Sequence, residues 1–153
     1  RITADLARLL DRLAEGRRLD LVGHSLGGLL SRWYLQEMGG ARYVDRIVTL
    51  ATPHAGTASA RIAPGPLRHA LLPGSAVVRR LAAGRSRAAG VAHTALVAGA
   101  DLMVTPPSSA AAIEGARVKW FDDLGHNAML YAPEVHAEVL AALGEEVALE
   151  RSA

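Results

Sequence analysis

Apolar and polar residues alternate along the chain with two different periods. Apolar side chains recur every three or four residues in 2–13, in 26–38 and again from Pro133 onward, and this spacing predicts amphipathic helices. Shorter runs without that spacing predict strands at 19–22, 44–50, 94–98 and 117–121. Because predicted strands and helices follow one another in turn, the chain should form parallel βαβ units, which is an α/β fold with about four strands and helices on its faces.

One long segment does not fit this alternation. Residues 54–90 are rich in proline, glycine, alanine and arginine, and a single helix is predicted within them at 76–83. This composition predicts a loosely structured excursion from the sheet. After it, the strand at 94–98 leads to a further short helix at 109–114.

Composition and charge exclude several classes of protein. With 153 residues, half of them apolar, the chain is long enough for one domain with a substantial core. Its longest uninterrupted apolar runs are four or five residues, far short of the roughly 20 that a membrane-spanning helix needs. The net charge is only +2 and the arginines are scattered, so no basic face for nucleic acid is predicted. The lack of cysteine excludes disulfides and a cysteine nucleophile, and no histidines and carboxylates have convincing metal-ligand spacing.

The strongest chemical signal is Gly-x-Ser-x-Gly at 23–27, between a predicted strand and a predicted helix. Such a turn holds Ser25 in an unfavourable backbone conformation and lifts its hydroxyl clear of the sheet. We expect Gly23 and Gly27 to leave room where strand and helix nearly touch. The first N–H groups of the helix point toward the group that the serine attacks, so the Leu26 amide is a candidate oxyanion donor.

A serine nucleophile needs a base, and six histidines compete for that role. Functional groups of a parallel sheet come from loops at the carboxyl ends of strands, and His24, His54 and His126 satisfy that condition. His24 adjoins the nucleophile and should point away from it, as a packing residue. His54 precedes every candidate acid, whereas His126 follows the fourth predicted strand. His126 is therefore the predicted base, with a surface-loop histidine as the alternative.

The predicted acid is Asp101, which follows the strand at 94–98. It gives the chain order serine, aspartate, histidine that is typical of a site built on this kind of turn. Asp122 and Asp123 lie nearer to His126 in sequence. They leave the same strand as that histidine, however, and we expect them to cap or solvate its loop.

These residues resemble those of bacterial lipases and esterases of the α/β-hydrolase superfamily. The resemblance spans most of the chain and rests on four segments, at 23–28, 52–57, 99–106 and 125–126. It implies that the loop carrying Asp101 follows the seventh strand of that fold and the loop carrying His126 the eighth. It also places His54 near the rim of the site, as a candidate substrate-binding residue. Thr105 departs from the family pattern, in which a small or apolar residue is more usual.

The resemblance makes 19–22 the fifth strand, so strands one to four, and the loop that supplies a second oxyanion N–H, are not in the sequence. We expect 1–153 to be a single partial α/β-hydrolase domain that lacks its N-terminal strands. The strand at 19–22 would then form an exposed apolar edge, and the isolated chain would be poorly soluble or weakly active. Related hydrolases place a cap where 54–90 falls, so this segment is a candidate lid, with a surface insertion as the alternative.

The prediction is a carboxylic ester hydrolase, a lipase or esterase without cofactor or metal, that acts on an acyl ester or lipid. Ser25 would attack the substrate, His126 would transfer the proton, and Asp101 would orient the imidazole. An acyltransferase or amidase could use the same three residues, and a binding module could keep the scaffold without the chemistry. The sequence assigns neither an oligomeric state nor a localisation, secreted or cytoplasmic.

Overall fold

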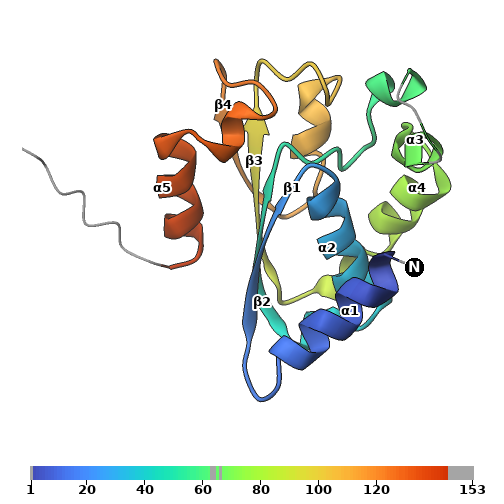
Figure 1. Ribbon diagram of the computed structural model, residues 1–153, viewed down its shortest axis with the longest axis vertical. Helices are drawn as coiled ribbons and strands as arrows, with labels where there is room; N and C mark the ends of the chain where they lie inside the picture. Colours follow the sequence, from blue (N-terminus) through green and yellow to red (C-terminus); the bar gives the residue numbers. More distant parts are fainter. Residues whose placement is uncertain (1, 63–64, 66, 145–153) are drawn as a thin grey trace, which may run out of the picture.

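Residues 2–62, 65 and 67–144 are described by the computed structural model, in which four parallel strands form one sheet in the order β1–β2–β3–β4 (Figure 1). The strands are β1 (Leu19–His24), β2 (Val44–Leu50), β3 (Ala92–Ala98) and β4 (Arg117–Phe121). Since neighbouring strands run parallel, their carboxyl ends lie at the same end of the sheet. The predicted α/β class is confirmed.

Helices cover both faces of this sheet (Figure 1). One side carries α1 (Ile2–Leu13), α2 (Leu26–Glu37), α3 (Leu67–Leu71) and α4 (Ala76–Ala83), and the other carries α5 (Pro133–Ala142). Successive side chains of a strand point to opposite faces. Ile47 of β2 accordingly joins the core with Tyr34 of α2, and Val48 joins the core with Val135 of α5. Two apolar cores therefore hold the sheet between its helices.

Strand β1 is longer than the pattern predicted. We expected Gly23 to end the strand, but Gly23 and His24 continue the ladder, opposite Thr49 and Leu50 of β2. Their hydrogen bonds outweigh the weak strand preference of glycine. Strand β3 also begins two residues earlier than predicted, at Ala92, and the helix expected at 109–114 is the 3-10 turn η4 (Pro107–Ala111).

The excursion at 54–90 is more regular than its composition predicted. Besides α3 and α4, it contains the 3-10 turns η2 (Ala58–Arg61) and η3 (Arg85–Ala88). Leu81 of α4 is fully buried, and a side-chain carbon on Gly56 would lie 2.6 Å from the Pro73 nitrogen. Residues 63, 64 and 66 lie outside the described residues. The described part is therefore packed rather than loose.

Strands β1 and β4 are the two edges of the sheet. On β1 the Val22 side chain is 52% exposed, as expected of an apolar edge, and Trp120 of β4 is exposed as well. Within the described ranges, no helix has both the length and the apolar character needed to cross a membrane.

Candidate active site

Ser25 lies in the sharp turn between β1 and α2. Its φ of 52° and ψ of −122° are outside the regions that residues with a side chain favour, so the backbone is strained there. Hydrogen bonds maintain the turn from both sides. The Ser25 N–H donates to the Leu50 carbonyl (2.9 Å), and the Gly28 N–H donates to the Ser25 carbonyl (3.1 Å). The residue is partly exposed at the carboxyl end of β1.

Two glycines let strand and helix meet at this turn. A side-chain carbon on Gly23 would lie 2.7 Å from the Gly28 nitrogen. One on Gly28 would overlap the side chain of Thr52, which follows β2. At Gly27 the same carbon would meet nothing within 4 Å among the described residues, so our expectation that Gly27 relieves crowding is wrong. Gly28 has that role, because the segment after β2 packs directly on the turn.

Asp101 and His126 form a buried pair. The His126 Nδ1–H donates to Asp101 Oδ2 at 2.8 Å, and the two residues are 6% and 3% exposed. The backbone N–H groups of Met103 and Val104 donate to the other carboxylate oxygen, at 2.7 and 2.8 Å. Three hydrogen bonds thus fix the carboxylate. With its hydrogen on Nδ1, a neutral His126 keeps the lone pair of Nε2 free to accept a proton.

The three predicted residues follow three strand ends at one end of the sheet: Ser25 after β1, Asp101 after β3, and His126 after β4. The structure joins Asp101 to His126 by a hydrogen bond, and no such bond joins the Ser25 hydroxyl to the imidazole. Bonds of this kind are often long in unliganded enzymes and shorten only when substrate is bound.

The sequence did not reveal that His24 contacts the loop of the predicted base. The His24 Nε2–H donates to the His126 carbonyl at 3.0 Å, and the two ring centroids are 4.6 Å apart. Burial, as the largest effect, lowers the pKa of His24 below its ordinary value. No local pattern could have predicted this contact, because the two residues are 102 positions apart.

An apolar cavity begins beside the turn. Leu26 is the first residue of α2, so its N–H has no acceptor within the helix and is available to a substrate oxygen. Its side chain lines a cavity of about 220 Å³ between α2 and the excursion. Apart from Thr3 of α1, the residues that line it are apolar: Leu26, Leu29, Leu30 and Trp33 of α2, Ala70 and Leu71 of α3 and Val77 of α4.

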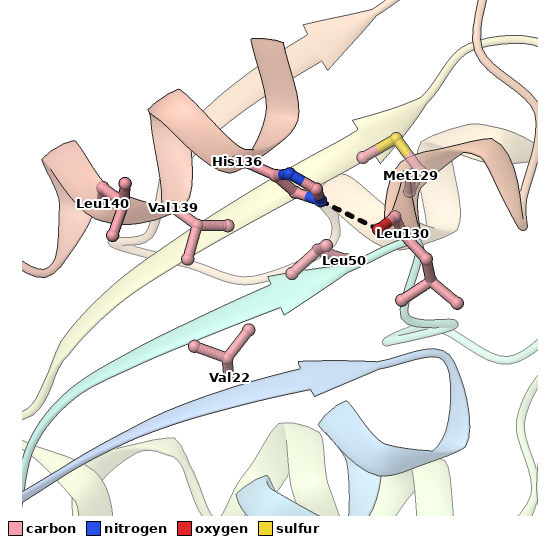
Figure 2. A pocket seen from close by; sticks show the side chains of 7 residues that line it. All are labelled: Val22, Leu50, Met129, Leu130, His136, Val139 and Leu140. Atoms are coloured by element: carbon pink, nitrogen blue, oxygen red, sulfur yellow. Dashed lines mark hydrogen bonds between the residues drawn. The ribbon is translucent and has the colours of Figure 1, made fainter. Parts of the chain in front are cut away.

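A second, larger apolar cavity of about 360 Å³ lies on the side of the sheet that α5 covers (Figure 2). Val22 of β1 and Leu50 of β2 form one wall, and Val139 of α5 forms another. In Figure 2 the His136 ring is hydrogen-bonded to the Leu130 carbonyl, at 2.8 Å. None of the candidate catalytic residues lines this cavity, so it is not the candidate site despite its size.

The expectation for His54 needs correction. Its side chain is not at a rim, because the residue is only 2% exposed. Arg32 of α2 donates to His54 Nδ1 at 3.2 Å, and Thr49 Oγ1 lies 3.0 Å from His54 Nε2. Arg32 also donates to the Leu81 carbonyl of α4, at 2.9 Å. His54 therefore belongs to a buried polar cluster that ties α2, β2 and the excursion together, and not to an exposed rim of the site.

His93 of β3 completes this cluster, with its Nε2 at 3.2 Å from Thr49 Oγ1. Burial, then the Arg32 charge, hold the pKa of His54 well below its ordinary value. The same causes in the same order lower the pKa of His93 to about 3. Burial also lowers the pKa of Arg32 to about 10. Both histidines are consequently neutral near pH 7.

Thr105, the departure from the family pattern, connects the acid loop to the excursion. Its N–H donates to Thr57 Oγ1 at 2.8 Å, and its carbonyl accepts the Ala58 N–H at 2.8 Å. Its hydroxyl accepts the Ser59 N–H at 3.2 Å. A threonine therefore fits here because the excursion offers polar partners.

Comparison with curated proteins finds no match, whereas solved structures share the fold. The mature form of Bacillus licheniformis lipase BlEst2 matches with a TM-score of 0.68 and 19% identity, over 94% of this chain and 73% of that one. Aspergillus fumigatus lipase B matches with a TM-score of 0.70 and 16% identity, over 94% and 41%. The lin2722 product of Listeria innocua matches with a TM-score of 0.66 and 15% identity, over 92% and 62%. This chain spans less than two-thirds of the last two proteins.

A family model described as palmitoyl protein thioesterase matches residues 2–99, which is more than half of the chain. The matched part contains the Ser25 turn and the segment after β2 that packs on it, and it ends before Asp101. Family and fold together support a hydrolase that acts on esters, and the predicted likeness to lipases and esterases is confirmed. The chain therefore belongs to the palmitoyl protein thioesterase family and has an α/β-hydrolase fold, of which it contains a part.

Proposed function

We propose that the protein hydrolyses acyl esters through a covalent acyl-enzyme, with Ser25 as nucleophile, His126 as general base and acid, and Asp101 as the orienting carboxylate. The observation that carries the proposal is a strained Ser25 turn at the same end of the sheet as a buried, hydrogen-bonded Asp101–His126 pair. Holding a serine at a positive φ costs roughly 1–3 kcal/mol, and strain of this kind clusters at functional sites.

In the proposed reaction, Ser25 Oγ attacks the carbonyl carbon while its proton passes to His126 Nε2. The imidazolium then returns that proton to the leaving alcohol as the carbon–oxygen bond breaks, and the acyl group stays on Ser25. A water molecule, deprotonated by the same nitrogen, then attacks the acyl carbon. The bond from that carbon to Ser25 Oγ breaks, Oγ takes the proton back from His126, and the acid is released. The Leu26 N–H would stabilise the oxyanion, and losing one such donor costs roughly 3–4 kcal/mol of transition-state stabilisation.

The cavity beside Leu26 supports an apolar acyl group as the substrate moiety. Its volume of about 220 Å³ is below the roughly 300–1,000 Å³ of a complete small-molecule site. It would therefore enclose a short acyl chain or the first part of a longer one. Since Leu71 and Val77 of the excursion form one wall, we also propose that 54–90 acts as a lid over this site.

A thioester is the second candidate substrate, and membership of the palmitoyl protein thioesterase family favours it. The attack on the carbonyl would be the same. A thiol, with a pKa near 8.5 in cysteine, leaves more readily than an alcohol, so a thioester would depend less on proton return from His126. Rates on oxygen esters and thioesters of equal acyl length, from acetyl to palmitoyl, would identify the preferred class.

Labelling with a fluorophosphonate tests the nucleophile. We expect stoichiometric labelling of the protein, loss of labelling in Ser25→Ala, and unchanged labelling in the control Ser86→Ala, which alters an exposed serine. Ester hydrolysis should be lost in the same variant and kept in the same control. A folded protein that is not labelled at all would favour a binding module and refute the proposal.

A further inference from the structure

We propose that His24 is a positioning residue, which holds the loop of His126 against the nucleophile turn through its Nε2–H; this inference rests on the proposed function. The His24 Nε2–H donates to the His126 carbonyl at 3.0 Å, and the two rings are in contact at 4.6 Å between centroids. His24 is the last residue of β1 and directly precedes Ser25.

The topology of the sheet explains why such a link is needed. Strands β1 and β4 are opposite edges of the sheet, so three strand spacings of roughly 4.8 Å separate them, about 14 Å in total. The loop after β4 must cross the ends of β3 and β2 before His126 can approach Ser25. The pairing of the strands alone therefore does not fix the position of His126 relative to Ser25.

The other hydrogen bonds that join this loop to the sheet go to β3 or to the residues that follow it. Asp101, which binds the imidazole, follows β3, and the Ala100 N–H donates to the Leu124 carbonyl at 3.0 Å. The Gly99 N–H donates to the Phe121 carbonyl at 2.8 Å, where β4 ends. The bond from His24 is the one that runs from the His126 backbone to the strand that carries the nucleophile. A displacement of a catalytic group by about 1 Å costs on the order of 100-fold in rate.

The charge state of His24 suits this task. The ionisable groups that act on it are the imidazole of His126 and the carboxylate of Asp101, and burial keeps the His24 ring neutral near pH 7. A neutral ring donates from Nε2 without opposing the positive charge that His126 gains when it takes the Ser25 proton. A cationic ring at this distance would repel that charge.

Two substitutions distinguish the effect of the hydrogen bond from the effect of side-chain size. In His24→Gln the amide N–H₂ reaches about as far as the imidazole Nε2 and does not titrate, whereas His24→Leu removes the donor. With a soluble short-chain ester at pH 8, we expect kcat to fall 10- to 100-fold in His24→Leu with KM little changed, which is the loss that a misplaced catalytic group predicts. His24→Gln should retain kcat within about threefold, as should the control Arg12→Leu, which alters an exposed residue of α1.

Two further measurements distinguish positioning from general stability. Hydrogen exchange of residues 122–131 should quicken in His24→Leu and not in His24→Gln, a readout that does not depend on activity. Below the pKa of His24, kcat/KM of the unmodified protein should fall with pH more steeply than that of His24→Gln. Equal kcat and equal exchange in His24→Leu and the unmodified protein would overturn the inference, as would a His24→Gln variant as impaired as His24→Leu. A protein without Ser25-dependent hydrolysis, but with the expected exchange pattern, would instead refute the proposed function.

Discussion

Mild acid should destabilise this protein through the buried cluster around Thr49. Arginine offers only N–H donors, so His54 Nδ1 must accept from Arg32, and His54 Nε2 must carry the hydrogen that it donates to Thr49 Oγ1. The Thr49 hydroxyl is then free to donate to His93 Nε2. Protonating His54 would set an N–H against the Arg32 guanidinium, and protonating His93 would bury a second positive charge near that of Arg32.

The pKa values give the sign and size of the effect. A histidine titrates near 6.5 in the unfolded chain, whereas the pKa of His93 in the folded protein is about 3, so the unfolded state binds more protons between these values. Stability is therefore complete above pH 6.5 and declines as the pH falls toward 3. At pH 5, 1.5 pH units below 6.5, a His93 that stays neutral costs about 2 kcal/mol, out of the roughly 5–15 kcal/mol of a typical domain. Burial lowers the pKa of His54 in the same direction, so its loss adds to that of His93.

Urea unfolding at pH 7.5 and at pH 5 measures this loss. With a slope of roughly 2 kcal/mol per molar urea, the loss at His93 alone should lower the midpoint by about 1 M. His93→Gln keeps an amide oxygen for Thr49 but does not titrate, so it should make the fall smaller by about 1 M. The exposed control His69→Gln should remove none. Equal midpoints at the two pH values, or the same fall in His93→Gln as in the unmodified protein, would refute the reasoning.

Three further substitutions test other parts of the site. Asp101→Asn should lower kcat on a soluble ester about 10,000-fold without changing the circular dichroism spectrum, because the amide selects the wrong imidazole tautomer; a loss below tenfold would contradict the assigned role. Gly28→Ala should lower the free energy of unfolding by about 1–3 kcal/mol, because the new methyl group overlaps Thr52. Equal unfolding midpoints in Gly28→Ala and in the control Gly27→Ala would argue against that crowding. Val77→Trp should lower kcat/KM at least tenfold for long-chain acyl esters and leave acetyl esters unaffected, and an equal loss on both would show that the cavity does not hold the acyl chain.

The sequence by itself determined the features that depend on local chemistry. Local pattern placed α1, β2, α4 and β4 at their observed bounds, because a helix that buries one face imposes a spacing on its apolar residues and a strand favours a short run of β-branched and aromatic ones. The strained turn at Ser25 was predictable for the same kind of reason, since glycines beside a serine between strand and helix allow few other conformations. The order of Ser25, Asp101 and His126 along a parallel fold then placed all three at one end of the sheet.

Only the tertiary structure decided which polar side chains are buried together. Nothing near His54 in the sequence indicates that Arg32 and His93 enclose it, and nothing near His24 indicates a bond to the loop of His126. The crowding of Gly28 by Thr52 is likewise a contact between the ends of two neighbouring strands. Such contacts depend on how β1, β2, β3 and β4 pair across the sheet. Pairing brings together residues far apart in the chain, so no short sequence pattern encodes these contacts.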